Sequence, residues 1–366
     1  MKLRNNRLKG LSLVMFVVCL FFVVPALCLA EATPDFGRCA DIKDDLLRLQ
    51  CYDEMAGKYQ AGAEELEAKE LEPNDLDEEE LDEEELEFYV VVPSKKLSYL
   101  ERLWESDSDP FRGKLAIKPH RSSYILPFSY NFSTNSDPIR EVYPERDTRD
   151  AEAAFQISLK TKIWEDILGR DIDLWFGYTQ RSFWQVYSWD DSAPFRETNY
   201  EPEVLLNMPM DFDLRLMSLK TINFGFNHQS NGRSEPLSRS WNRIVANFGF
   251  ERNGLFSKDD TLVLELKTWY RIPESDSSDD NPHMYEYFGY GEIWASYFWN
   301  KHRFAMMVRN NLESDDNRGA LQVEWTFPLN NRIGGYLQYY VGYGESLLDY
   351  NHSVNRLGLG FILMDW

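Results

Sequence analysis

The segment Phe155-Gln-Ile-Ser-Leu-Lys-Thr-Lys-Ile163 decides the fold class of this chain. Its odd positions are mainly apolar, whereas its even positions are polar and include two lysines. Because successive side chains of a strand point to opposite faces, this alternation predicts a β-strand with one apolar face and one charged face. Burying unpaired charges in an apolar core is costly, so the charged face needs a polar environment.

Segments of the same kind, separated by polar turns, follow one another from about residue 120 to residue 366. Two architectures can use such strands: a soluble sandwich with apolar inner faces, or a transmembrane barrel that is apolar outside and polar inside. We count twelve segments, near residues 122–131, 152–164, 171–187, 198–212, 217–229, 240–252, 260–272, 286–299, 301–312, 318–327, 332–346 and 354–365.

The length and charge of these segments favour the membrane barrel. They reach ten or more residues, above the usual length of about 5–6 and suited to a tilted crossing of the bilayer. Several charged side chains fall on the faces that would point inward, namely Lys160, Lys162, Glu265, Lys267 and Glu324. We therefore predict an all-β fold, in which residues 120–366 form a twelve-stranded antiparallel transmembrane β-barrel.

Both ends of the chain carry patterns typical of exported proteins. Basic residues precede an apolar run from Leu11 to Leu29, and small Ala30 follows. This pattern predicts a signal peptide over residues 1–30, with an uncleaved membrane anchor as the alternative. The last residues, Phe361-Ile-Leu-Met-Asp-Trp366, resemble the assembly signal of outer-membrane barrels. We therefore expect the protein in the outer membrane of a Gram-negative bacterium.

A short helical or disordered extension is expected between the signal peptide and the barrel. Residues 31–61 have the apolar spacing of a short helix and contain Cys39 and Cys51, which are expected to form a disulfide in an oxidising compartment. Free thiols or a metal pair are the alternatives. Residues 62–119 include the stretch 64–87, with 15 acids and one Lys, which predicts a solvated low-complexity arm. An acidic binding tail is the alternative for this stretch.

The composition excludes several classes of protein. The chain is 43% apolar and 15% aromatic, too rich for a disordered protein. A net charge of −22 argues against a surface that binds nucleic-acid phosphates. A mean hydropathy of −0.49 argues against a bundle of membrane helices.

Familiar catalytic signatures are absent from the sequence, which has no Gly-x-Ser-x-Gly, no His-Glu-x-x-His and no phosphate-binding loop. His228 is the histidine whose surroundings indicate chemistry. The other histidines lie in expected loops or strand ends and are interpreted as solvated: His120, His283, His302 and His352.

His228 belongs to the strand Thr221-Ile-Asn-Phe-Gly-Phe-Asn-His-Gln-Ser230. By period two, His228 and Ser230 continue the apolar face of this strand, near the rim of the barrel. In the next strand, Asn242 likewise heads an apolar stripe. If the hairpin pairs so that residue numbers sum to 470, His228 faces Asn242.

The three side chains together match the requirements of acyl transfer. Ser230 would be the nucleophile, His228 its base, and Asn242 the acceptor that fixes the imidazole tautomer. The alternative is that all three are ordinary rim residues of a porin.

The region around these residues resembles the active-site region of outer membrane phospholipase A. The resemblance covers roughly residues 120–366. The matching blocks are Asn227-His-Gln-Ser-Asn-Gly-Arg-Ser234, Ser238-Arg-Ser-Trp-Asn-Arg243, Gly177-Tyr-Thr-Gln180, Ser192-Ala-Pro-Phe-Arg-Glu-Thr-Asn-Tyr200, Asp280-Asn-Pro282 and Gly342-Tyr-Gly-Glu-Ser-Leu-Leu-Asp-Tyr-Asn351.

This resemblance implies a calcium-dependent homodimer that hydrolyses sn-1 and sn-2 acyl esters of phospholipids and lysophospholipids. It places the catalytic roles on His228, Ser230 and Asn242. It also places the Ca²⁺ contacts on Arg233 and Ser238 of one subunit and on Ser192 of the other, with Arg233 acting through its carbonyl oxygen.

Gln180 matches the polar interface residue of the family dimer and lies on an outward, apolar face. A lone amide on such a face would gain from pairing with its twin in a second subunit. The alternative is an amide bonded to water at the membrane interface. Two other functions stay open at this point: a non-catalytic barrel, such as a channel or structural protein, and a lipid A deacylase.

Overall fold

The computed structural model of the chain describes residues 97–105, 116–275 and 279–364. The expected signal peptide, the Cys39–Cys51 pair and the acidic stretch 64–87 lie outside the described residues.

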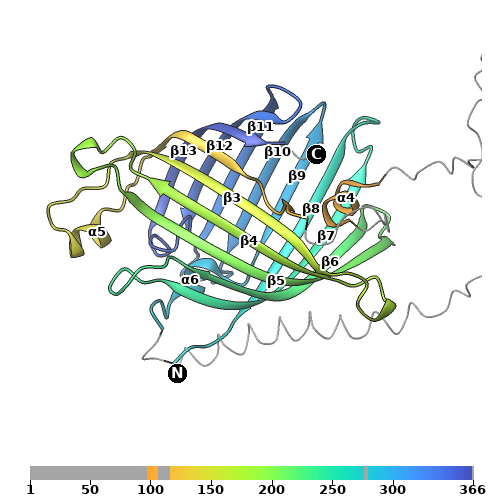
Figure 1. Cartoon of the computed structure of the whole chain (residues 1–366), viewed down its shortest axis with the longest axis horizontal. Coiled ribbons are helices and arrows are strands. Elements are labelled where there is room, and N and C mark those ends of the chain that lie inside the picture. Colours follow the sequence, from red (N-terminus) through yellow and green to blue (C-terminus); the bar gives the residue numbers. More distant parts are fainter. Residues whose placement is uncertain (1–96, 106–115, 276–278, 365–366) are drawn as a thin grey trace, which may run out of the picture. The chain divides into compact units, whose positions relative to one another are not determined.

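Twelve long strands form a closed antiparallel barrel (Figure 1). Each strand pairs with its neighbours in the chain, β13 pairs with β2, and β3–β4 completes the ring. The predicted fold class is confirmed. The strands are β2 (Tyr124–Asn131), β3 (Ala151–Trp164), β4 (Asp173–Trp184), β5 (Phe195–Asp213), β6 (Ser218–Ser230), β7 (Ser240–Asn253), β8 (Thr261–Arg271), β9 (Gly291–Trp299), β10 (His302–Asn310), β11 (Gly319–Pro328), β12 (Ile333–Tyr343) and β13 (Ser353–Leu363).

The two faces of the barrel wall are those that the period-two pattern predicts. In β3, Ile157 and Leu159 are exposed on the outside, whereas Lys160 and Lys162 are buried in the lumen. Glu324 of β11 is also buried. The outer wall is an apolar belt suited to lipid, and the charged face is turned inward.

The connections at the two ends of the barrel differ in length. Turns such as 300–301 and 329–332 are short, whereas the opposite end carries α5 (Asp137–Val142), η3 (Trp189–Asp191) and α6 (Met284–Phe288). In outer-membrane barrels the short turns face the periplasm and the long loops face the exterior. The strand ends that carry His228 and Ser230 therefore lie at the exterior rim.

One expected strand starts later than its sequence pattern indicates. We predicted a strand from residue 286, but residues 284–288 form α6 and β9 starts at Gly291. The alternating aromatic residues in this stretch imitate a strand. Met284 and Phe288 are instead buried in one apolar cluster, which includes Trp241 and Trp269. Packing against this cluster outweighs the local pattern.

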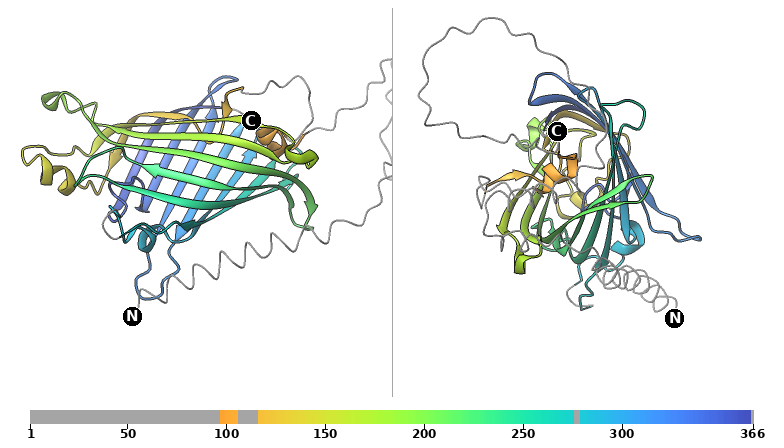
Figure 2. Two further views of the ribbon diagram at one scale, coloured as in Figure 1. Left: turned by 60° about the horizontal axis from the view of Figure 1, so that its bottom comes forward. Right: turned by 90° about the vertical axis from the view of Figure 1, so that its right-hand side faces the viewer.

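A short helix, α4 (Tyr99–Trp104), belongs to the barrel and lines its lumen (Figure 2, right). The Glu251 carboxylate accepts the backbone N–H groups of Tyr99 and Leu100, at 3.0 and 2.9 Å. At the other end of the helix, Lys160 Nζ lies 3.4 Å from the Trp104 ring centroid. The barrel unit therefore reaches back into the range 62–119, which the sequence analysis assigned to the arm.

Two smaller elements complete the described part of the chain. β1 (Lys118–Pro119) pairs with β3 beside the short β2, and η2 (Ile167–Gly169) lies in the turn between β3 and β4. Among the described residues, no helix has the length and apolar character needed to cross a membrane.

Candidate active site

The hairpin of β6 and β7 brings two of the predicted site residues into contact. Its register pairs His228 with Asn242 and Ser230 with Ser240, so the predicted register is confirmed. Asn242 Oδ1 lies 2.8 Å from His228 Nδ1. Because this oxygen can only accept, the geometry makes Nδ1 the protonated nitrogen and leaves Nε2 with a free lone pair.

Ser230 lies two residues beyond His228 on the same outward face of β6, and all three side chains are half-buried. On its other side, Ser230 faces Tyr200 of β5 across the ladder. The lumen-facing neighbours Asn223 and Asn227 are buried, as the face assignment requires. Ser, His and Asn are thus gathered on the wall that meets lipid.

The loop after Ser230 is organised around one buried side chain, Asn231. Its Oδ1 accepts the N–H groups of Arg233 and Arg239, and its Nδ2 donates to the Leu237 carbonyl at 2.8 Å. These bonds hold the loop in one shape. Two predicted Ca²⁺ contacts, Arg233 and Ser238, are therefore placed at fixed positions beside the Ser-His-Asn set.

The Arg233 guanidinium ties this loop to the start of β5. Its Nη2 donates to the carbonyl oxygens of Phe195 and Arg196, at 3.3 and 2.6 Å, and its Nε lies 3.5 Å from the Glu197 carboxylate. The positive charge is thus engaged within its own subunit. Any role of Arg233 toward a cation must come from its backbone oxygen.

Ser238 lies beside the carboxylate of Asp280, which in turn contacts Glu235. Its Oγ donates to Asp280 Oδ2 at 2.5 Å. A hydrogen bond with Asp280 raises the pKa of the exposed Glu235. The contact between Glu235 and Asp280 was not predicted, because the position of Glu235 in the loop belongs to no periodic pattern. A Glu-Asp pair across two loops is visible only in three dimensions.

Ser192, the third predicted Ca²⁺ contact, is exposed in the connection between β4 and β5. It caps η3 with a left-handed backbone, at φ 58°. Within the described residues, no group of three or more His, Cys, Asp or Glu side chains is arranged to hold a metal ion. The oxygen donors present around the predicted contacts are hydroxyl and carbonyl oxygens and the Asp280 carboxylate beside Ser238.

Gln180 lies on the outward face of β4, as predicted. It accepts from Tyr178 Oη at 3.1 Å and donates to Ser182 Oγ at 3.2 Å. In the register of the sheet, Gln180 faces Tyr200, which in turn faces Ser230. A short polar row therefore runs across three strands of the apolar wall, from Gln180 to the Ser-His-Asn set.

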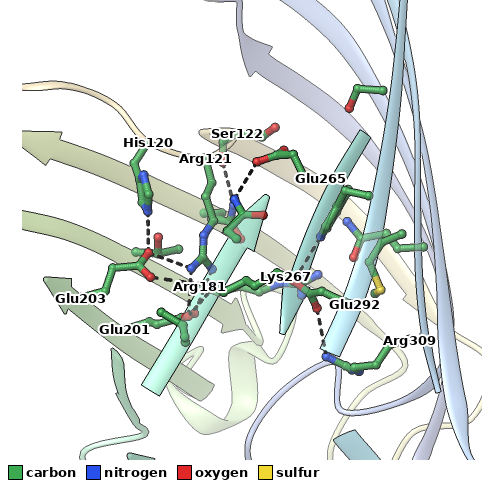
Figure 3. A pocket seen from close by; sticks show the side chains of 18 of the residues that line it. His120, Arg121, Ser122, Arg181, Glu201, Glu203, Glu265, Lys267, Glu292 and Arg309 are labelled. Atoms are coloured by element: carbon green, nitrogen blue, oxygen red, sulfur yellow. Dashed lines mark hydrogen bonds and ion pairs between the residues drawn. The ribbon is translucent and has the colours of Figure 1, made fainter. Parts of the chain in front are cut away.

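The lumen holds a separate charged network (Figure 3). Arg121 donates to Glu201 at 3.0 and 2.9 Å and to Glu203 at 2.9 Å. Lys267 Nζ lies 3.8 Å from both of these carboxylates. Because each acid has basic partners, the network neutralises itself around a cavity of about 250 Å³.

The interpretation of His120 as a solvated histidine was wrong. Its ring is buried, and Nε2 lies 2.5 Å from Glu203 Oε1 (Figure 3). Its backbone N–H donates to the carbonyl of Ser158 on β3, directly after the β1 pairing. This extra pairing carries the chain along the inner side of the barrel and turns the imidazole into the lumen.

The barrel and the Ser-His-Asn set together indicate the general class of protein to which the chain belongs. A closed barrel with an apolar belt, and with Ser, His and Asn on that belt at the exterior rim, is an outer-membrane β-barrel with the side chains of a hydrolase.

The chain belongs to the phospholipase A1 family, whose model matches residues 100–363. It is 35% identical to the putative phospholipase A1 of Neisseria meningitidis over 356 residues, or 90% of each chain. It is 34% identical to phospholipase A1 of Klebsiella pneumoniae over 273 residues, which cover 75% of this chain and 90% of the relative.

Solved structures agree with this assignment. The Salmonella typhi outer membrane phospholipase, a dimer with bound calcium, is 33% identical and superimposes with a TM-score of 0.64, covering 72% of this chain and 97% of that chain. The Escherichia coli outer membrane phospholipase A is also 33% identical, with a TM-score of 0.62, and the match covers 68% and 94%. The protein is an outer-membrane phospholipase, which decides against the non-catalytic barrel and the lipid A deacylase.

Proposed function

We propose that the protein hydrolyses acyl esters of phospholipids and lysophospholipids through Ser230, His228 and Asn242. The observation that carries this proposal is the 2.8 Å contact between His228 Nδ1 and Asn242 Oδ1, with Ser230 on the same outward face. Asn242 holds the imidazole in the tautomer that presents Nε2 as a base. An amide suits a site beside hydrocarbon, because an unpaired carboxylate there is costly to desolvate.

The reaction follows from these roles. Ser230 Oγ attacks the ester carbonyl while His228 Nε2 takes the hydroxyl proton, and collapse of the tetrahedral intermediate breaks the bond to the glycerol oxygen. His228 returns the proton to that oxygen, which leaves as the lysophospholipid alcohol. A water molecule, deprotonated by Nε2, then attacks the acyl-enzyme and releases the fatty acid. The position of the site on the lipid-facing wall supports phospholipid esters as substrates, and the family resemblance extends the proposal to both the sn-1 and the sn-2 ester.

Calcium is proposed as the cofactor, bound by Ser192, Arg233 and Ser238. The donor set fits: hydroxyl and carbonyl oxygens are ligands that Ca²⁺ accepts, and Asp280 adds a carboxylate beside Ser238. Bound there, Ca²⁺ would supply positive charge that stabilises the oxyanion of the ester. The solved Salmonella relative is a dimer with bound calcium, which supports the same assignment here.

The active form is proposed to be a homodimer that meets through the wall carrying Gln180. Ser192 of one subunit would complete the calcium set of the other. The polar row from Gln180 to Ser230 lies on an apolar surface, where an amide gains most from pairing with a second copy of itself.

The first test is fatty-acid release from mixed micelles of phospholipid and detergent by the purified protein. We expect release with calcium, none with chelator, and a loss of at least about 10³-fold in Ser230→Ala. Equal release by wild type and Ser230→Ala would remove Ser230 from the mechanism. Release that is equal with calcium and with chelator would remove calcium.

A further inference from the structure

Asn242 has a second polar partner besides His228. Its Nδ2 donates to Glu274 Oε1 at 3.1 Å, while its Oδ1 faces the imidazole at 2.8 Å. We infer that Glu274 is a positioning residue, which orients the Asn242 amide so that its oxygen, and not its NH₂ group, faces His228. This inference rests on the proposed Ser-His-Asn mechanism and extends it by one residue.

The fold delivers Glu274 to this place by continuing the β7–β8 ladder beyond the end of β8. Arg243 pairs with Arg271, and the N–H of Ile272 still donates to the Asn242 carbonyl at 2.8 Å. Glu274 follows two residues later, so it shares the outward face of Ile272 and becomes a diagonal neighbour of Asn242. Its side chain is half-buried at this rim.

The Glu274 carboxylate favours one of the two orientations of the Asn242 amide. An amide can present either its oxygen or its NH₂ group to a neighbour, and the two orientations differ by a flip of the side chain. An ionised carboxylate only accepts, so Glu274 bonds the NH₂ group and opposes the flip. The Asn242 oxygen is then held toward Nδ1–H of His228, and Nε2 stays available to Ser230.

The carboxylate also compensates for the neutral acceptor in the triad. During catalysis the imidazole becomes positively charged, and a negative partner near it stabilises that state. Glu274 supplies this charge through Asn242, from a half-exposed position at the rim where a carboxylate keeps part of its hydration.

The experiment compares three substitutions of Glu274 in the full-length protein with calcium in the micelle assay. Glu274→Gln keeps an acceptor oxygen but loses the negative charge, Glu274→Ala removes both, and Glu274→Lys replaces the acceptor by a positively charged donor. We expect kcat to fall less than about threefold, about tenfold and about 100-fold respectively, with KM unchanged, against about 10²–10⁴-fold for loss of a general base. Asp315→Asn, an exposed carboxylate in the β10–β11 loop, is the matched control and keeps wild-type kcat.

A double-mutant cycle separates positioning from a general effect on the fold. In an Asn242→Ala background, Glu274→Ala and Glu274→Lys should cause no further loss of kcat, because the Asn242 amide that Glu274 orients is absent. The same fractional loss in both backgrounds, or a change confined to KM, would overturn the inference. So would Glu274→Ala with wild-type kcat.

The controls keep this inference apart from the proposed function. If fatty-acid release by the wild type does not require calcium and Ser230, the proposed mechanism is wrong. The inference about Glu274, which depends on that mechanism, is then wrong as well. If wild type is active, Ser230→Ala is inactive and the Glu274 series is flat, the inference alone fails. Folding of every variant is checked by the faster migration of the intact barrel on unheated detergent gels, and Glu274→Gln provides the isosteric variant least able to disturb it.

Discussion

The barrel has two polar regions that differ in how their side chains are paired. In the lumen, charged side chains are buried and meet opposite charges, as Glu152 does with Arg196 and Arg356 at 3.0 and 2.8 Å. On the outer wall, the Ser230 region is half-buried, and His228 keeps one nitrogen for chemistry. The difference teaches that charge alone does not indicate an active site here. The lumen network joins distant strands, whereas the outer set, in which Glu274 contacts Asn242, is available to react.

If this contrast is correct, substitutions in the lumen change stability more than the turnover of folded molecules. The largest effect is expected for Glu152→Ala, which leaves Arg196 and Arg356 buried without this carboxylate. Breaking such a buried pair from one side costs about 3–5 kcal/mol. A lowered denaturation midpoint in detergent, with kcat per folded molecule within about twofold of wild type, is the expected result. Glu141→Ala, an exposed residue of α5, is the control.

An unchanged midpoint for Glu152→Ala would break the comparison, because the lumen network would then not stabilise the barrel. A large loss of kcat without loss of stability would also contradict it, since the lumen would then take part in the reaction.

The docked helix α4 provides the second prediction. Leu100 is 1% exposed and packs against Val263 and Phe298. Gly249 makes room for it, because a Cβ there would lie 3.0 Å from Leu100 Cδ1. Leu100→Ala removes these contacts and should destabilise the barrel by about 3 kcal/mol. Denaturation midpoints are compared with those of Leu312→Ala, a change at an exposed loop leucine. Equal midpoints would mean that α4 is only loosely held.

The smallest effect is expected at Asp349, in the loop between β12 and β13. Burial alone would raise the pKa of Asp349, but Arg196 and hydrogen bonds from Ser346 and Asn135 lower it below its ordinary value. Its contribution to stability is therefore fully present above the unfolded pKa of about 3.9 and is lost as the pH falls through the lower folded value.

The corresponding variant, Asp349→Asn, should be less stable than wild type by about 1 kcal/mol at pH 6, because Arg196 keeps Glu152 as a partner. The gap between the two proteins should close as the pH falls below about 4. Denaturation midpoints measured at pH 6, 5, 4 and 3 follow this change. A gap that widens in acid would show that the sign of the linkage is reversed.

Much of the site could be predicted from residue spacing. The period-two pattern assigned His228, Ser230 and Asn242 to the outward face. A hairpin register in which the numbers of paired residues sum to 470 then placed His228 opposite Asn242. His228 and Asn242 are only 14 residues apart and lie on consecutive strands of one hairpin, so the local pattern is sufficient to identify them as neighbours.

Other neighbours could not be predicted in this way. Glu274 reaches Asn242 only because the ladder continues past β8 into a loop that has no periodic pattern of its own. The α6 segment imitates a strand by its aromatic spacing, and its buried cluster decides the outcome.

The sequence by itself determined the strands, their two faces and the pairing of consecutive strands, because these depend on contacts between residues close along the chain. The tertiary structure decided which charges meet across the lumen, where His120 points and how α4 is held. Glu152 and Arg356 are neighbours only once β13 returns to β2 and the barrel closes. A side-chain alternation specifies the face on which a residue lies, but only the closed ring brings distant residues of one face together.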